Sequence, residues 1–265
     1  MILRRDGDAV LAIGQASHAW LSGQLARAWG NARFPVAAPF EEVCLGALQH
    51  DIGMAEWDLR PERHPDTGLP RQFFELDRRT HLALWTAAPT RVLSQSRYAA
   101  LLVSLHGTGL YERFPPNTDD PEIARAVADY LDGQRALQAR LAAEVGATPE
   151  ELARNQALLA IWDGLSLALC RDQAPHVIDG FTLDRAGAVA VPPRGQTPKR
   201  KCYERDAFTL DPWPFTSDRL NVRVEGRLLT AAPYPDEPAL HAALDRAPVL
   251  TVGLDLRPRE RRSRG

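Results

Sequence analysis

Apolar residues recur at helical spacing through the first two thirds of the chain. One such stripe comprises Phe40, Val43, Cys44, Ala47 and Leu48. Residues three and four positions apart share a helix face, so this stripe predicts an amphipathic helix. Similar stripes run through 21–29, 98–105 and 152–167, and a more polar helix is expected over 120–145. We therefore predict that residues 1 to about 175 are helical.

The last third of the chain has a different period. Apolar and polar residues alternate in 220–224 and 250–256, and Val189 and Val191 follow the same rule. A period of two is typical of a half-buried strand, and an antiparallel sheet can cover helices with one face. The expected fold class is mainly α, with a small C-terminal antiparallel β appendage. The predicted units are a helical domain (1–175), the β-rich appendage (176–257) and an Arg-rich tail (258–265).

Composition narrows the class of protein. The chain has 265 residues, 45% of them hydrophobic and 25% charged, which is typical of a globular protein and excludes a disordered chain. The 32 basic and 34 acidic residues give a net charge of −2, so a nucleic-acid partner is not expected. No apolar run is long enough to span a membrane. Three widely spaced cysteines favour a reducing compartment, and we expect a cytoplasmic protein with no membrane partner.

Several titratable residues fall on or beside the apolar stripes. Asp51 and Asp163 lie on faces predicted to be buried, where a lone carboxylate is costly unless it is paired, protonated or bound to a metal. Four histidines lie on or at the ends of the predicted helices: His18, His50, His81 and His106. Imidazoles and carboxylates are usual ligands of manganese, iron, nickel and zinc. We therefore predict a site for one or two divalent transition-metal ions.

The order of these residues resembles the HD superfamily of metal-dependent phosphohydrolases. That superfamily is all-helical and is named for an adjacent His-Asp doublet, which here is His50-Asp51. Its minimal ligand set adds an earlier histidine and a late aspartate, and His18 and Asp163 match them. The resemblance implies an HD-type helical bundle, with His50 and Asp51 as the catalytic residues.

Members of this superfamily that bind two metals carry further histidines between the doublet and the last aspartate. His81 and His106 occupy those places. The resemblance implies that Asp51 bridges the two ions, which would activate a water molecule and polarise a phosphoryl oxygen. The implied substrate is a small phosphate ester or a nucleotide.

One position departs from the pattern of the superfamily. Many hydrolytic members carry a phosphate-binding lysine where this chain has Met54. Guanidinium groups also suit phosphate oxygens, so arginines are the alternative. The candidates are Arg33, Arg60, Arg63, Arg71, Arg78 and Arg79. Of these we select Arg60 and Arg71, with Tyr111, as the predicted substrate-binding residues.

The full chain also resembles the uncharacterised bacterial DUF3891 family. The segments that carry this resemblance are 15–19, 49–53, 57–58, 67–70, 101–107 and 162–165. The strand-rich end belongs to the same resemblance. It implies no settled activity.

Other interpretations of the same residues remain open. His18 can cap a helix end, His106 can be the C-terminal cation of its helix, and Asp163 can pair with an arginine in the core. Some HD-fold proteins with the same ligand order hold two irons and cleave carbon bonds with oxygen, and Met54 keeps that alternative open. A third possibility is a non-catalytic HD-fold protein that binds a ligand.

Overall fold

One seven-stranded mixed sheet extends through residues from both ends of the chain. The computed structural model describes residues 1–115, 119–186 and 206–260. Its strands are β1 (Ile2–Asp6), β2 (Ala9–Ile13), β3 (His176–Ile178), β4 (Phe181–Arg185), β5 (Asp206–Asp211), β6 (Leu220–Thr230) and β7 (Val249–Pro258). They pair in the order β1-β2-β6-β7-β5-β4-β3, and only β5 and β7 run parallel.

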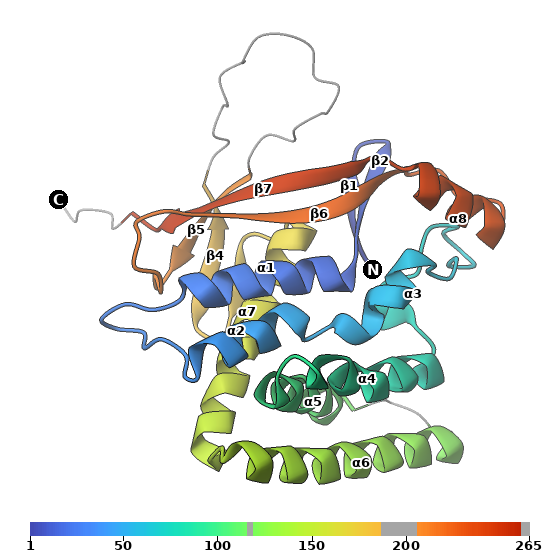
Figure 1. Ribbon diagram of the computed structural model, residues 1–265. Coiled ribbons are helices and arrows are strands. Elements are labelled where there is room, and N and C mark those ends of the chain that lie inside the picture. Colours follow the sequence, from blue (N-terminus) through green and yellow to red (C-terminus); the bar gives the residue numbers. More distant parts are fainter. Residues whose placement is uncertain (116–118, 187–205, 261–265) are drawn as a thin grey trace.

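The described residues form eight helices; most lie on one side of this sheet, and the last packs with Ala12 and Leu229 at the end of the sheet. They are α1 (Gln15–Ala28), α2 (Phe40–Gln49), α3 (Ala55–Leu59), α4 (Arg78–Leu93), α5 (Arg97–Arg113), α6 (Pro121–Val145), α7 (Pro149–Arg171) and α8 (Glu237–Arg246). Two 3-10 turns, η1 (Ile52–Met54) and η2 (Phe73–Glu75), complete the set. Figure 1 shows α1 directly beneath β6 and β7, then α2, then α4 and α5, with α6 farthest from the sheet. The helices are therefore stacked in layers under the sheet.

The predicted fold class, a mainly α bundle with a small C-terminal β appendage, is wrong. The sheet is curled like a half-barrel, and 53% of the described residues are helical and 21% are in strands. The sheet is larger than expected because residues 1–13, which we predicted to be helical, form the hairpin β1–β2. Strand β2 pairs with β6, so the first strands join those near the C-terminal end. The strand expected around Val189 and Val191, Cys202, and most of the Arg-rich tail lie outside the described residues.

The N-terminal hairpin has a clear local cause. Asp6 pairs with Ala9, which leaves a two-residue turn, and Gly7 adopts a φ of +58° at its first position. A side chain is strained at such a φ, so glycine is the residue that the turn needs. Residues Val10 to Ile13 are all buried, because β2 lies between β1 and β6 and above the helices.

Two glycines let neighbouring backbone segments approach closely near the doublet His50-Asp51. A Cβ on Gly23 of α1 would lie 2.7 Å from the Cβ of Leu48 on α2, so glycine permits the close packing of these helices. A Cβ on Gly53 would collide with the carbonyl oxygen of Leu84 on α4. Gly53 lies in η1 and allows this turn to pack on α4.

Helix α5 is longer than predicted. We expected it to end at His106 and Gly107, but it continues to Arg113. His106 therefore lies inside the helix and is not a cation at its C-terminus. Glycine costs about 1 kcal/mol in a helix interior, and here it is retained because a Cβ on Gly107 would lie 2.5 Å from the hydroxyl of Tyr130 on α6.

The sheet contains a buried carboxylate of its own. Asp255 on β7 is 3% exposed, and the guanidinium of Arg219 binds both of its oxygens. The Arg219 Nε to Asp255 Oδ1 distance is 2.6 Å. A paired, bidentate arginine is the usual way to bury such a group.

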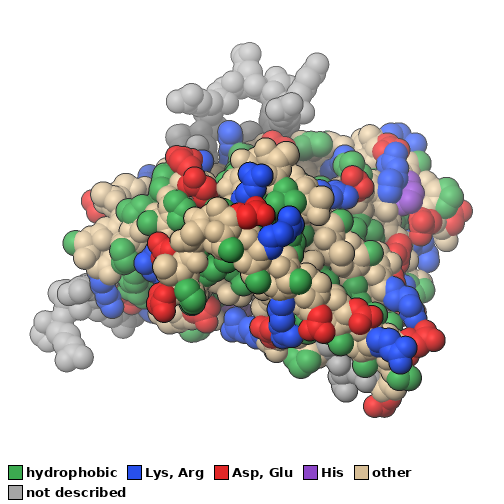
Figure 2. Space-filling view, turned by 60° about the horizontal axis from the view of Figure 1, so that its bottom comes forward, with side chains coloured by type: hydrophobic (Ala, Val, Ile, Leu, Met, Phe, Trp, Pro, Cys, Tyr) green, Lys and Arg blue, Asp and Glu red, His purple; other side chains and the backbone are tan. Residues whose placement is uncertain are grey.

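The molecular surface drawn in Figure 2 carries both signs of charge. Basic and acidic side chains lie next to one another on this face, with apolar side chains scattered between them. Salt bridges such as Arg79–Glu122 and Arg135–Glu112 account for part of this mixture. Among the described residues, no helix combines the length and hydropathy needed to cross a bilayer.

Candidate metal centre

The doublet His50-Asp51 lies where α2 ends. His50 is the C-cap residue, and its Nδ1 donates to the carbonyl oxygen of Ala47 over 2.8 Å. This bond leaves the lone pair of the imidazole on Nε2. Nε2 is buried and has no hydrogen-bond partner among the described residues. Its nearest polar atoms are carboxylate oxygens of Asp163, at 3.4 Å, and of Asp51, at 3.6 Å. A buried ring nitrogen that faces two carboxylates at this spacing is a feature that a bound metal ion would explain.

His18 lies one turn inside α1 and is fully buried. Its Nδ1 is 2.9 Å from the hydroxyl of Ser166, which itself donates to the carbonyl oxygen of Asp163. Since the proton of Ser166 is used in that bond, His18 Nδ1 is the donor to Ser166. The Nε2 of His18 lies 2.6 Å from Asp51 Oδ2. His18 is thus not a helix-end cap, and its Nε2 points into the cluster.

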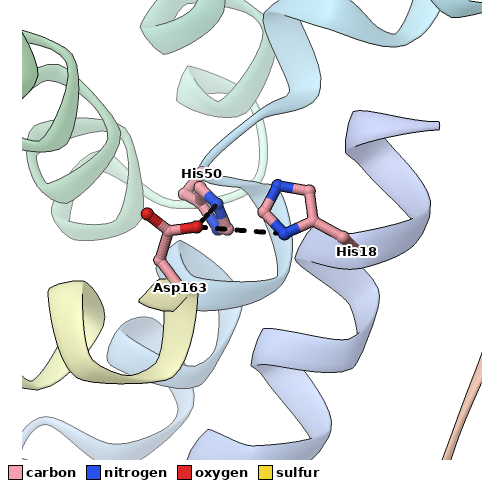
Figure 3. Close-up of side chains that lie close together, drawn as sticks. All are labelled: His18, His50 and Asp163. Carbon is pink, nitrogen blue, oxygen red and sulfur yellow. Dashed lines mark ion pairs between the residues drawn. The ribbon is translucent and has the colours of Figure 1, made fainter. Parts of the chain in front are cut away.

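Asp163 on α7 closes the cluster from the opposite side. Its Oδ1 lies 3.4 Å from His50 Nε2 and 3.8 Å from His18 Nδ1. Figure 3 shows the three side chains pointing toward one another from α1, from the end of α2 and from α7. Among the described residues, Asp163 forms ion pairs with imidazoles. The alternative that Asp163 pairs with an arginine in the core is therefore not what the structure shows.

His106 on α5 joins the same cluster. Its Nε2 is 3.8 Å from Asp163 Oδ2, and its ring centre is 4.7 Å from that of His50. Two groups therefore have ligand atoms within 4.8 Å of one another: His18, His50 and Asp163, and His50, Asp51 and His106. His50 belongs to both groups. The other four side chains therefore surround the His50 ring, and the five residues come from four helical segments.

Opposite charges dominate the electrostatics of this cluster. Burial would lower the pKa of His50, but the charges of Asp51 and Asp163 and its hydrogen bonds raise it to about 9. Burial would raise the pKa of Asp51, yet His50 and His18 hold it below its usual range. The pKa of Asp163 is lowered in the same way. Burial would raise it, but the hydrogen bond and the charge of His50 have the larger effect together. Protons on imidazoles therefore supply the positive charge that a metal ion can replace.

His106 behaves differently from His50. Burial, followed by the positive charge of His50, lowers the pKa of His106 to about 4. The ring is therefore neutral at pH 7, which is the form that binds metals. A neutral imidazole beside a carboxylate is a suitable metal ligand.

The structure does not group His81 with the other five candidates. Its Nδ1 lies 2.6 Å from the hydroxyl of Tyr111, and the indole of Trp85 donates to its Nε2 over 3.2 Å. Both ring nitrogens are therefore engaged within the described residues. Burial, with the charge of Arg78, lowers the pKa of His81 to about 4.

Three residues that we did not predict hold the cluster in place: Gln15, Asp58 and Ser166. Gln15 donates from Nε2 to Asp51 Oδ2 over 3.0 Å, and its Oε1 is buried without a partner among the described residues. Asp58 accepts from the backbone N–H of Gln15 and so fixes the start of α1. Ser166 sets the orientation of His18. A signal existed for two of them, because Gln15 and Ser166 lie three residues from His18 and Asp163 and share their helix faces.

The cluster opens to solvent on one side. His106 and Asp163 line a cavity of about 530 Å³, together with Phe73, Gln156 and Arg113. Asp163 is partly exposed, whereas His18 and His50 are completely buried. A molecule that enters this cavity therefore meets Asp163 and His106 first.

Two of the predicted substrate-binding residues lie elsewhere. Arg60 pairs with Asp245 near α8, at 2.6 Å between Nη1 and Oδ1. Arg71 pairs with Glu62 at 3.1 Å and donates to the carbonyl oxygen of Glu75. Neither lines the cavity beside Asp163. Tyr111 lies close by, in a smaller hollow beside His81.

The segment that we expected to be a loop, 57–77, is partly ordered in short helices and supplies Phe73 to the cavity. Phe73 is thus the residue of this segment that lines the cavity. Arg60 and Arg71, which we selected from the same segment, do not line it.

Comparison with known families decides where the chain belongs. Residues 1–231 match the family described as "Protein of unknown function (DUF3891)". The chain belongs to the DUF3891 family. That match includes all five residues of the cluster and six of the seven strands. Comparison with curated proteins and with solved structures finds no match.

Proposed function

We propose that this DUF3891 protein is a metal-dependent phosphohydrolase that acts on a phosphate ester. The observation that carries the proposal is the cluster of three imidazoles and two carboxylates around Nε2 of His50, which faces Asp163 and Asp51 at 3.4 and 3.6 Å. The order of these residues along the chain, which resembles the HD superfamily, supports the same activity.

The residues fit a transition-metal ion on chemical grounds. His18 and His50 each engage Nδ1 with an oxygen atom, so each aims Nε2 at the carboxylates. Metal-binding histidines usually have their second nitrogen held in this way. We propose that His18, His50, Asp51 and Asp163 hold one ion, and that His106 with Asp51 serves a second. The donors are nitrogen and oxygen, which suits manganese, iron, nickel or zinc.

When bound, the metal would lower the pKa of a coordinated water and polarise a phosphoryl oxygen. The protein side chains have other tasks. Gln15 Oε1 lies buried beside Asp51 and can accept a hydrogen bond from the attacking water. Asp163 and His106 face the cavity and so contact the substrate side of the centre.

Phosphate recognition requires positive charge near the cavity. Met54, at the position of the lysine in many HD hydrolases, is 2% exposed and packs in the core. Arg113 lines the same cavity as Asp163, and Arg78 lines the adjoining hollow. We propose that these guanidinium groups bind the phosphate oxygens in place of Arg60 and Arg71.

A diiron oxygenase on the same ligands is the second proposal. Met54 favours it, because the usual lysine for phosphate is replaced by a buried apolar residue. Metal identity separates the two, since oxygen chemistry requires a redox-active metal. The cytoplasmic location also stays a proposal, which the burial of the free Cys44 and Cys170 agrees with.

The test is metal content followed by activity. We expect protein purified without a metal-affinity step to hold one or two manganese, nickel or zinc ions and to hydrolyse p-nitrophenyl phosphate. His50→Gln should lose both properties. About two irons per chain, with no phosphatase activity, would favour the oxygenase. No metal, before or after reconstitution, would contradict both proposals and leave a non-catalytic protein.

A further inference from the structure

Two adjoining hollows lie beside the candidate metal centre. The larger, of about 530 Å³, contains His106 and Asp163, and the smaller, of about 230 Å³, contains His81 and Tyr111. Both are lined by Phe73, Leu110 and Phe114. A molecule can therefore occupy the two hollows at once, with one end at the cluster.

The smaller hollow is unusually apolar for a surface site. Phe73, Phe74, Leu76, Leu110 and Phe114 supply most of its wall. Phe74 is 58% exposed and Phe114 is 65% exposed, and they are among the few large apolar side chains that the described residues leave open to water. Exposed apolar side chains gathered at one place mark a site that an apolar partner covers.

A fixed hydrogen-bond network lies at the polar end of this hollow. Since the indole of Trp85 donates to His81 Nε2, a neutral His81 must carry its proton on Nδ1. Nδ1 then donates to the Tyr111 oxygen, and the guanidinium of Arg78 lies over the Tyr111 ring, 5.6 Å from its centre. The hydroxyl of Tyr111 accepts the bond from His81 and keeps its own proton free to donate to a ligand.

We propose that the smaller hollow binds a ring-sized apolar group of the substrate, and that the phosphate of the same molecule lies at the metal centre. The substrate class is thus an aryl or similarly compact apolar phosphate ester, with Tyr111 donating a hydrogen bond to the ester oxygen or a ring substituent. This inference rests on the proposed function for the phosphate end.

The size of the hollow supports a group of that kind. An engineered protein cavity of about 150 Å³ binds benzene. A hollow of about 230 Å³ therefore accepts one substituted ring, or a branched alkyl group of similar volume, but not a long chain. Arg113 and Arg78 lie at the two hollows and suit an anionic rather than a neutral substrate.

The experiment compares two non-hydrolysable ligands that share one anionic group. Binding of phenylphosphonate and of methylphosphonate to the manganese-loaded protein is measured by calorimetry. We expect the phenyl compound to bind at least about 10-fold more tightly, because its ring buries apolar surface. The double variant Phe74→Ala/Phe114→Ala should remove most of this difference. Val249→Ala, which trims another exposed apolar residue on β7, should retain it.

The outcomes separate this inference from the proposed function. Equal binding of the two phosphonates would overturn the inference and leave the phosphohydrolase intact. If neither phosphonate binds, benzyl alcohol is titrated next. Binding that depends on Phe74 and Phe114 would retain the apolar hollow and refute the phosphate function, whereas no binding would refute the hollow as well.

Discussion

The molecule buries carboxylates in two regions and neutralises them in different ways. In the sheet, Asp255 is bound at both oxygens by Arg219, whose guanidinium keeps its proton at any ordinary pH. Under the sheet, Asp51 and Asp163 face histidines, whose ring nitrogens can bind either a proton or a metal ion. A carboxylate held by arginine is a fixed structural pair. A carboxylate held by imidazoles can exchange protons for a metal ion, and this difference separates a functional site from a structural one.

The sharpest test of that comparison replaces one carboxylate in each region. Asp51→Asn removes a predicted ligand, and we expect manganese affinity to fall by more than the roughly 10–100-fold that is typical when a residue supporting a ligand is lost. Asp255→Asn is the matched control, because Asp255 is equally buried but faces Arg219. It should lower the melting temperature and leave metal affinity unchanged. Equal metal affinity in the two variants would place the metal elsewhere.

A smaller effect is expected from the residue that orients His18. Ser166→Ala removes the acceptor for His18 Nδ1, so the ring is no longer fixed with Nε2 toward Asp51. We expect metal affinity to fall about 10–100-fold, with circular dichroism unchanged. Ser104→Ala, in a buried hydrogen bond between α5 and α6, is the control and should retain full affinity. Full affinity in Ser166→Ala would show that His18 does not depend on this bond.

The smallest effect is expected for a buried thiol, which is paired neither with an arginine nor with a histidine in the described residues. Cys170 lies on α7, the helix of Asp163, and burial raises the pKa of its thiol to about 12. The unfolded thiol ionises near pH 8.5, so stability is complete below that pH and declines as the pH rises toward 12. We expect the free energy of unfolding of Cys170→Ala to fall by about 2 kcal/mol less than that of the wild type between pH 8 and pH 10 in urea titrations. If the free energies of unfolding of the two proteins changed equally with pH, this prediction would be contradicted.

The fold was only partly predictable from the sequence. The stripes identified the helices that end at His50 or contain His106 and Asp163, because one apolar face repeats over about two or more turns in each. The first strands were missed although Asp6-Gly7 between apolar runs is a hairpin signal. Their partner β6 lies about 200 residues away, and no local pattern specifies that pairing.

The candidate site was predictable where polar residues interrupt apolar stripes. The structure brings His18, His50, Asp51, His106 and Asp163 together, and each was visible as a polar residue on or beside a predicted buried face. Nothing in the spacing separates His81 from them, because its hydrogen bonds to Trp85 and Tyr111 depend on tertiary packing. The apolar wall at Phe74 and Phe114 lies in a turn and at a helix end, where periodicity carries no information.

The link between α1 and β6 has a consequence for the order in which the molecule is assembled. Ser17, the neighbour of His18, exchanges two hydrogen bonds with the backbone of Glu225 across 208 residues. At synthesis rates of about 5–20 residues per second, that partner leaves the ribosome roughly 10–40 seconds after Ser17. Until then α1 can pack on α2, and Asp58 can hold its first turn, but its link to the sheet is missing. The sheet-facing side of the helix that carries His18 is therefore fixed only after residue 225 has been made.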